Sequence, residues 1–255
     1  MREGRQVYVA LESAKGPHVT PELYTWSDGR LWFPAATSTL KARVIDDGSR
    51  LAAAVVGRGS TVIFEGVAEL FDPRRPSTIL RASAAPRMLR ALTSFGVRNT
   101  SDLLGFARDT VKGDSVSRIP NARLFICVAP ERMALIENDR VAWQSGWHAH
   151  VIAPPADVPS GGEPAVAAFD GPRIAPARWF ADDERAFVSP DVLALHGVSG
   201  DTGVAVVVDH YNAPGPAAKQ GVLVRGDGVV DDNGWIDVTA RRTVAWDGAE
   251  VTPQH

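Results

Sequence analysis

The sequence predicts a mainly β protein built from two tandem small β-barrels, with a short helical insertion in the first. Three observations lead to this prediction: strand-like runs are separated by turn residues, one stretch of sequence recurs in the second half, and the composition is that of a globular chain. The 255 residues are 45% hydrophobic and 22% charged, which argues against disorder or a coiled coil. At roughly 150 residues per domain, the length suits one large or two small domains.

The strands are predicted from alternating runs that are rich in β-branched and aromatic residues. Residues 18–26 and 30–34 are such runs, and they flank Ser27, Asp28 and Gly29. Asp-Gly between two strands is typical of a tight hairpin, because glycine tolerates a positive φ. A second hairpin is expected at residues 57–59. Short strands joined by hairpins favour a small closed or split barrel over a parallel α/β sheet.

A short helix is expected at about residues 38–47. Thr37 or Ser38 can cap it, Leu40 and Val44 share one face, and Gly48 can end it.

The first barrel also carries a predicted helical insertion at about residues 75–118, between its last two strands. Gly96 and Gly113 are the expected helix stops, and Ser101 is an expected cap. The apolar residues at helical spacing are Met88, Leu89, Leu92, Phe95, Leu103, Leu104, Ala107 and Val111.

An internal repeat defines the two domains. Residues 16–35 recur at residues 171–190 with a constant offset of 155 residues, and later strands match with small shifts. We therefore expect a first barrel over residues 1–150 and a second over residues 151–255, with a Pro- and Gly-rich connector at about 151–164. The matched positions and segments are Gly16, Pro17, Pro21, Asp28 and Arg30 with Gly171, Pro172, Pro176, Asp183 and Arg185, then 51–56 with 204–208, 62–66 with 222–226, and 125–136 with 235–246.

Charge and hydropathy limit the partners. The formal net charge of −3 gives no general attraction for nucleic acid. No apolar run approaches the roughly 20 residues of a membrane helix, and the polar start lacks the apolar stretch of a signal peptide. We expect a cytoplasmic protein. Its single cysteine, Cys127, lies among apolar residues and is expected to be a buried strand thiol.

A basic excess lies between Arg74 and Arg123. Nine Arg and one Lys against three Asp give this segment a net charge of +7, so the remainder carries −10. The segment is either a solvated face or a surface beside a polyanionic ligand.

Residues 5–70 resemble the flavin-binding split barrel family, the pyridoxamine 5′-phosphate oxidase-like fold that includes F420-dependent reductases. The resemblance lies in the opening strand at 7–11, followed in order by GPHVTPELYTWSDGRLWF, TSTLKARVIDD, LAAAVV and TVIFEGVAEL. In that family two barrels pair and bind the flavin at their interface. The resemblance implies a paired dimer fused into one chain, with FMN or F420 as cofactor, which moves a hydride or electrons to or from a small-molecule substrate.

The start of the short helix is the candidate anion site. Thr37, Ser38 and Thr39 offer hydroxyls and backbone N–H groups there, Lys41 adds a positive charge, and Arg43 can assist. The alternative is an ordinary helix cap with a solvated lysine. The resemblance implies that Ser38 and Lys41 hold a cofactor phosphate. It also implies that the strand carrying Val19, Thr20 and Pro21 runs along the isoalloxazine ring.

The second copy departs from this pattern. At the offset of 155, Lys41 falls on His196, and residues 191–199 lack the hydroxyl cluster. A neutral imidazole is a weaker phosphate partner than a lysine. We therefore expect one cofactor site per chain, at the interface of the two copies, with the second barrel supplying a wall. Further homodimerisation is left open.

Other chemistry finds little support in the sequence. His148 and His150 could share a strand face, but no further ligand accompanies them at a telling distance, so we expect no metal site. No GxSxG elbow, P-loop or GxGxxG is present. We assign no catalytic side chain, because in flavin enzymes the cofactor carries the chemistry. The alternative function is a degenerate barrel that binds a flavin, haem or nucleotide-like ligand without turnover.

Overall fold

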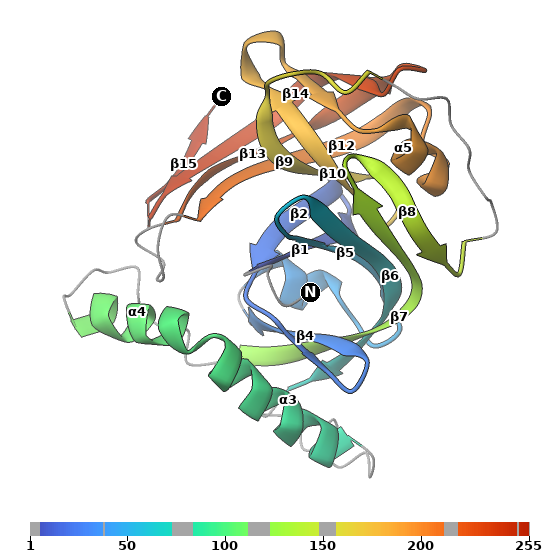
Figure 1. Cartoon of the computed structure of the whole chain (residues 1–255). Helices are drawn as coiled ribbons and strands as arrows, with labels where there is room; N and C mark the ends of the chain where they lie inside the picture. Colours follow the sequence, from blue (N-terminus) through green and yellow to red (C-terminus); the bar gives the residue numbers. More distant parts are fainter. Residues whose placement is uncertain are drawn as a thin grey trace.

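The structure is a computed structural model that describes residues 6–37, 39–72, 84–111, 123–147, 157–211, 219–248 and 250–254. We refer to residues 6–147 as the first half and to residues 157–254 as the second half. Each half is built on one antiparallel sheet, and Figure 1 shows the two sheets packed against each other.

The first half contains a sheet of eight strands that curls round on itself (Figure 1). The strand order is β2-β1-β5-β6-β7-β4-β3, and β8 pairs with β7. The elements are β1 (Val7–Ser13), β2 (Gly16–Glu22), β3 (Thr25–Ser27), β4 (Arg30–Ala36), α1 (Leu40–Val44), β5 (Arg50–Val56), β6 (Ser60–Phe71), α3 (Ala84–Arg98), α4 (Thr100–Val111), β7 (Arg123–Glu137) and β8 (Arg140–Ser145).

The second half forms a closed ring of strands. Its order is β11-β10-β9-β12-β13-β14-β15, and a further pairing of β11 with β14 closes the ring. The elements are β9 (Glu163–Phe169), β10 (Arg173–Phe180), a 3-10 turn (Ala181–Asp183), β11 (Arg185–Phe187), α5 (Pro190–His196), β12 (Gly200–Tyr211), β13 (Lys219–Val230), β14 (Trp235–Asp247) and β15 (Glu250–Gln254).

The two halves repeat one topology. The order β2-β1-β5-β6-β7-β4 in the first half matches β10-β9-β12-β13-β14-β11 in the second. A helix, α1 or α5, follows β4 or β11 in each half. The predicted mainly β barrel fold is confirmed. The domain boundary at residue 150 and the connector stay predictions, since residues 148–156 lie outside the described chain and β9 already begins at Glu163.

The core continues from one half into the other because β5 is buried on both faces. Leu51, Ala53 and Val55 point into the first barrel, whereas Ala52 and Ala54 join the core shared with the second half. Successive side chains on a strand point to opposite faces. A strand that is buried on both faces is therefore apolar at each of its buried positions, here Leu51 to Val55. The small alanines let β10 pack closely across β5.

A β-bulge interrupts the long hairpin of each half at the same place. Between β6 and β7 the register shifts at Glu65/Gly66, and between β13 and β14 it shifts at Arg225/Gly226. A Cβ on Gly66 would overlap the backbone at Ala129, and one on Gly226 would overlap the backbone at Thr239. Each bulge thus requires a glycine. These positions also correspond in the predicted repeat, although the duplication itself stays a prediction.

The predicted hairpins are present. Asp28 and Gly29 have φ of 53° and 70°, and Ser27 pairs with Arg30 across the turn. Positive φ at both central residues is the geometry of a type I′ turn. The hairpin at residues 57–59 joins β5 to β6, with the Gly57 N–H donating to Ser60 O at 2.8 Å.

Helix α1 is shorter than predicted and is capped one residue later than we expected. It spans Leu40–Val44 rather than 38–47, because Ile45 is buried with extended backbone. Thr39, not Thr37 or Ser38, is the N-cap, and its Oγ1 accepts from Ala42 N at 3.5 Å. Ser38 lies outside the described residues.

The boundary between the helices of the insertion was also predicted wrongly. Gly96 lies inside α3, which continues to Arg98, and Ser101 lies inside α4 rather than capping it. The helices separate at Asn99, whose buried side-chain amide donates to Tyr24 O and Phe95 O. These hydrogen bonds to the barrel set the boundary between α3 and α4 at Asn99, a position that the spacing of apolar residues in the sequence does not indicate. Gly113 lies outside the described residues.

The bulge glycines give a test of the fold. Gly66→Ala is expected to lower the free energy of unfolding by about 2 kcal/mol, since the new methyl meets fixed backbone. Gly96→Ala is the matched control, because a Cβ there meets nothing within 4 Å and lies in a helix. This control is expected to stabilise by about 0.5 kcal/mol. Urea unfolding measures both, and a neutral Gly66→Ala would contradict the bulge.

Candidate functional site

A cavity of about 610 Å³ lies between the two halves and is the candidate site. We call it the main cavity. The first half contributes the β1–β2 turn, His18 on β2, and one side of α1, and the second half contributes β13 and β14. Its lining residues are Ser13, Ala14, Lys15, His18, Leu40, Arg43, Val44, Leu223, Arg225, Arg242 and Val244.

The lining of the main cavity combines apolar walls with positive charge. Every ionisable side chain that lines it among the described residues is basic: Lys15, His18, Arg43, Arg225 and Arg242. The walls between them are the aliphatic side chains of Leu40, Val44, Leu223 and Val244. Such a surface favours an organic molecule that carries negative charge.

Arg225 joins the two halves at the edge of the cavity. From β13 its guanidinium donates to Pro17 O at 3.0 Å and to Lys15 O at 2.9 Å, both in the first half. The three N–H···O contacts to residues 15–17 hold the β1–β2 turn against the second half. The shape of the main cavity therefore depends on this side chain.

His18 is a neutral polar group facing this basic cluster. Burial, followed by the charges of Arg225, Lys41 and Arg242, lowers the pKa of His18 to about 4. Its Nδ1 is buried without a hydrogen-bond partner. A buried polar atom left unpaired costs free energy, and a bound molecule that hydrogen-bonds to it would remove that cost.

Lys41 lies at a second, smaller cavity of about 180 Å³, beside Pro21 and Thr39. Its buried ammonium group is ion-paired with Glu22 and donates to Thr20 Oγ1 at 2.9 Å. Lys219 of the second half also lines this small cavity. The structure thus brings Thr20, Pro21 and Lys41 together, with a carboxylate that the sequence analysis did not anticipate.

The other predicted site residues are distributed differently. Arg43 is exposed and lines the main cavity. The Val19 side chain is fully buried in the core that both halves share, so only its backbone can face a ligand. Thr37 is partly buried in the turn between β4 and α1. Ser38 lies outside the described residues, and so do His148 and His150.

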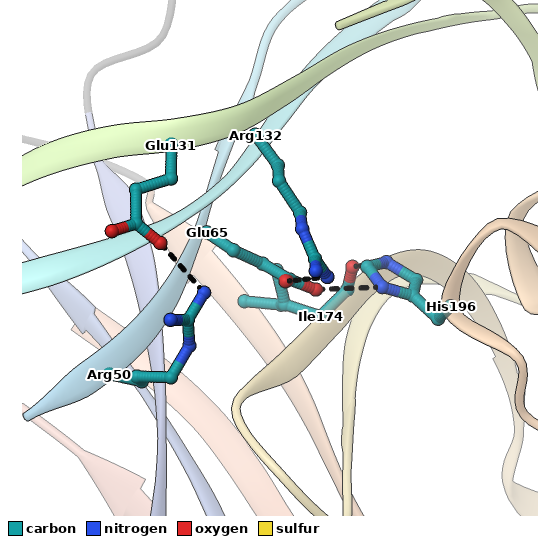
Figure 2. A network of polar contacts seen from close by, with 6 residues as sticks. All are labelled: Arg50, Glu65, Glu131, Arg132, Ile174 and His196. Carbon is teal, nitrogen blue, oxygen red and sulfur yellow. Dashed lines mark hydrogen bonds and ion pairs between the residues drawn. The ribbon is translucent and has the colours of Figure 1, made fainter. Parts of the chain in front are cut away.

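The corresponding position at the other contact between the halves, where α5 of the second half faces β6 and β7 of the first, is filled by side chains. Figure 2 shows His196 of α5 and Arg132 of β7 both directed at the carboxylate of Glu65 on β6. His196 Nδ1 lies 3.1 Å from Glu65 Oε1, and Arg132 lies 3.1 Å from Glu65 Oε2. The Trp147 ring packs edge-on against the imidazole, whose side chain is only 1% exposed.

This network contains one proton that has to sit between Glu65 and His196. His196 Nε2 lies 2.8 Å from Ile174 O, and a carbonyl only accepts, so Nε2 donates. The contact with Glu65 therefore needs a proton on Nδ1 or on the carboxyl group. Burial alone would raise the pKa of Glu65, but His196 and Arg132 together lower it below its usual 4.5. His196 and Arg132 thus both favour the charged form of the Glu65 carboxylate.

Sequence reasoning expected the second barrel to supply a wall of the site, but it did not identify Arg225 and Arg242 as the charged residues of that wall. The signal was present in the predicted repeat, where Glu65 corresponds to Arg225, and Arg132 corresponds to Arg242. An opposite-charge pair in one copy is a like-charge pair in the other. This difference in charge distinguishes the position occupied by Glu65, Arg132 and His196 from the basic main cavity.

The basic insertion lies away from this cavity. Helix α3 packs on β3, where Arg98 lies over the Tyr24 ring and Ser94 hydrogen-bonds to Thr25. Figure 1 shows α3 and α4 on the side of the first barrel opposite the second half. None of the described residues of the insertion lines the main cavity. Within the described chain, no helix is long and apolar enough to cross a lipid bilayer.

The fold and the cavity define a split β-barrel protein with a ligand-sized space between its two halves. No family model and no curated protein matches the chain.

Among solved structures, the chain is similar at low identity to a general stress protein, an FMN-binding protein and an F420 reductase. General stress protein 26 from Bacillus anthracis is 12% identical and matches 53% of this chain and 86% of its own, with a TM-score of 0.33. A pyridoxamine 5′-phosphate oxidase-related, FMN-binding protein from Nostoc punctiforme is 14% identical over 52% and 74%, with a TM-score of 0.37. An F420 reductase is 16% identical over 52% and 91%, with a TM-score of 0.34.

The Glu65 network predicts acid sensitivity. Because the folded-state pKa of Glu65 lies below 4.5, its contribution to stability is present above that pH and is lost as the pH falls. Glu65→Gln is expected to cost about 3 kcal/mol at neutral pH, since it leaves buried partners unmatched. It should also flatten the acid limb of stability against pH.

The control for this prediction is Glu131→Gln. The ion pair of Glu131 with Arg50 is about half exposed and lies beside the network (Figure 2), so little change is expected. The free energy of unfolding of all three proteins is measured by urea titration between about pH 3 and pH 7, in steps of about one pH unit. Equal acid slopes for wild type and Glu65→Gln would rule out the assigned role of Glu65.

Proposed function

We propose that this protein binds FMN or F420 between its halves and transfers a hydride or electrons between that cofactor and a small substrate. The observation that carries the proposal is the main cavity, which both halves line with aliphatic walls and, among the residues that the structure describes, with ionisable groups that are all basic. Flavins and deazaflavins combine a flat ring with a phosphate, so they match both properties of the lining. The resemblance of residues 5–70 to the flavin-binding split barrel family points to the same ligands.

The chain has groups suited to each part of the cofactor. Leu40, Val44 and Leu223 offer apolar surface to a ring, and the orphaned His18 Nδ1 offers a hydrogen-bonding atom. The two basic residues of α1, Lys41 and Arg43, are the proposed holders of the phosphate. Thr37 and Ser38 are proposed to add hydroxyls to it, and β2 from Val19 to Pro21 to run beside the ring.

The protein's part in the reaction is to bind, orient and exclude water. When bound, the cofactor supplies the hydride or electron transfer. The apolar walls keep the reacting centre dry, and Arg225 fixes the distance between the two sides of the cavity through its bonds to residues 15–17. Such positioning requires no acid or base from the chain.

A ligand-binding protein without turnover is the second candidate function. The observation in its favour is the ion pair between Lys41 and Glu22, which already neutralises the lysine. A phosphate at Lys41 has to compete with that carboxylate. A ligand with its negative charge elsewhere, such as a haem or another nucleotide-like molecule, would instead meet Arg43 and leave this pair intact.

Cofactor titration tests the binding proposal. We expect one FMN or F420 per chain, because the corresponding position between α5 and the first half is filled by His196, Glu65 and Arg132. Arg43→Gln and Lys41→Ala are each expected to weaken binding about tenfold, the equivalent of one charge-assisted contact. Arg58→Gln, at the exposed β5–β6 turn, is the control and should bind as wild type. Two cofactors per chain, or none, would contradict the proposal.

A redox cycle distinguishes the enzyme from the binding protein. The protein loaded with the cofactor that binds is reduced with dithionite for FMN, or with an F420-reducing dehydrogenase for F420. The absorbance of the ring is then followed after an acceptor is added. An enzyme is expected to restore the oxidised spectrum faster than free cofactor does. Equal rates with and without protein, over a panel of acceptors, would favour binding without turnover.

A further inference from the structure

A third cavity, of about 550 Å³, is also lined by the β1–β2 turn. We call it the side cavity. It shares Ala14, Lys15, Arg225 and Arg242 with the main cavity, so the two spaces are neighbours around one hairpin turn. Its other ionisable lining residues are Asp170, Asp227 and Arg241.

The β-bulge of the second half gathers three arginines at this cavity. Arg225 pairs with Arg242 in the register of β13 and β14, and the bulge adds Arg241 as the extra residue beside them. Like charges directly opposite on neighbouring strands are destabilising. Burial lowers the pKa of Arg225, and the charge of Arg242 lowers it further, whereas the carboxylate of Glu12 acts in the opposite direction.

Each of the carboxylates near the arginines has a hydrogen-bond or ion-pair partner other than Arg242, and two of them, Asp170 and Asp227, line the side cavity. Asp170 accepts from the Gly203 N–H and from Thr202 Oγ1. Asp227 is paired with Arg241 at 2.6 Å. Glu12 accepts from the Gly171 N–H at 2.9 Å.

Arg242 therefore remains without a counter-ion. In the described part of the chain its guanidinium makes no hydrogen bond or ion pair, and it is exposed to solvent. The guanidinium of Arg225 donates its hydrogen bonds mainly to backbone carbonyls of the first half. The side cavity thus has a positive group whose partner the chain does not provide.

The first half shows what a structural pair at this position looks like. There the bulge carries Glu65 opposite Arg132, and the two form an ion pair of 3.1 Å. The second half has an arginine where the glutamate would be. A pair of opposite charges would be sufficient if the bulge only had to be stable. The pair of like charges at the bulge of the second half therefore points to an anion from outside the chain.

We propose that the side cavity binds the anionic group of the small substrate, a carboxylate or a phosphate ester, with Arg242 as its principal contact. This inference rests on the proposed function, because it places the substrate next to the cofactor in the main cavity. A guanidinium presents parallel N–H donors that match the two oxygens of either group. Lys15, at the turn between the cavities, adds charge from the first half.

The test titrates cofactor-free protein with sodium phosphate and, separately, with sodium acetate, while chloride holds the ionic strength constant. Arginine Nε–H resonances report binding. We expect saturable shifts with at least one anion, and the stronger of the two identifies the substrate's group. Arg242→Gln is expected to weaken that binding about tenfold, whereas Arg58→Gln is expected to leave it unchanged. Thermal melts check that both variants are folded.

A competition experiment separates this inference from the proposed function. The titration is repeated with protein saturated with the cofactor that binds. Persisting anion binding supports a separate substrate subsite, whereas displacement by the cofactor would overturn it. If neither FMN nor F420 binds but the Arg242-dependent anion site persists, the cofactor proposal fails and the anion site stands. No saturable binding, or an unchanged affinity in a folded Arg242→Gln, would overturn the anion site itself.

Discussion

The protein depends above all on the contact between its two halves. The central strands β1 and β5 send branched aliphatic side chains into the first barrel, and they send Ala52 and Ala54 of β5 and Tyr8 and Ala10 of β1 toward the core shared with the second half. Neither face meets water, so removing one half would expose an apolar surface on the other. Because the main cavity is lined from both halves, the burial that stabilises the fold also creates the candidate site.

Charge distinguishes two positions that the topology makes alike. Each half contains a helix, a bulged hairpin and a contact with its neighbour. At one position Glu65, Arg132 and His196 satisfy each other and occupy the space. At the other, Arg225 and Arg242 repel each other beside an open cavity. A buried network with its partners complete is a structural element, whereas an unbalanced cluster is suited to a ligand.

Much of the fold could be predicted because it follows from patterns of neighbouring residues along the chain. Asp28-Gly29 specifies its hairpin through positive φ, and the repeat at an offset of 155 gave the two similar halves. Helix ends were less predictable. Gly96 did not end α3, since the contacts of Asn99 with Tyr24 decided where the helices part. Helix α1 ends at Val44 because Ile45 is buried with extended backbone, and its N-cap is Thr39 rather than Thr37 or Ser38.

By itself, the sequence determined the β architecture, the repeated order of its segments and the basic residues of α1, since each follows from neighbours along the chain. Only the tertiary structure decided what those residues face. It paired Lys41 with Glu22, brought Arg225 and Arg242 from about 200 residues away to the β1–β2 turn, and placed the basic insertion on the far side of the barrel. Electrostatic interaction depends on distance in space, and that distance is set by packing between the halves.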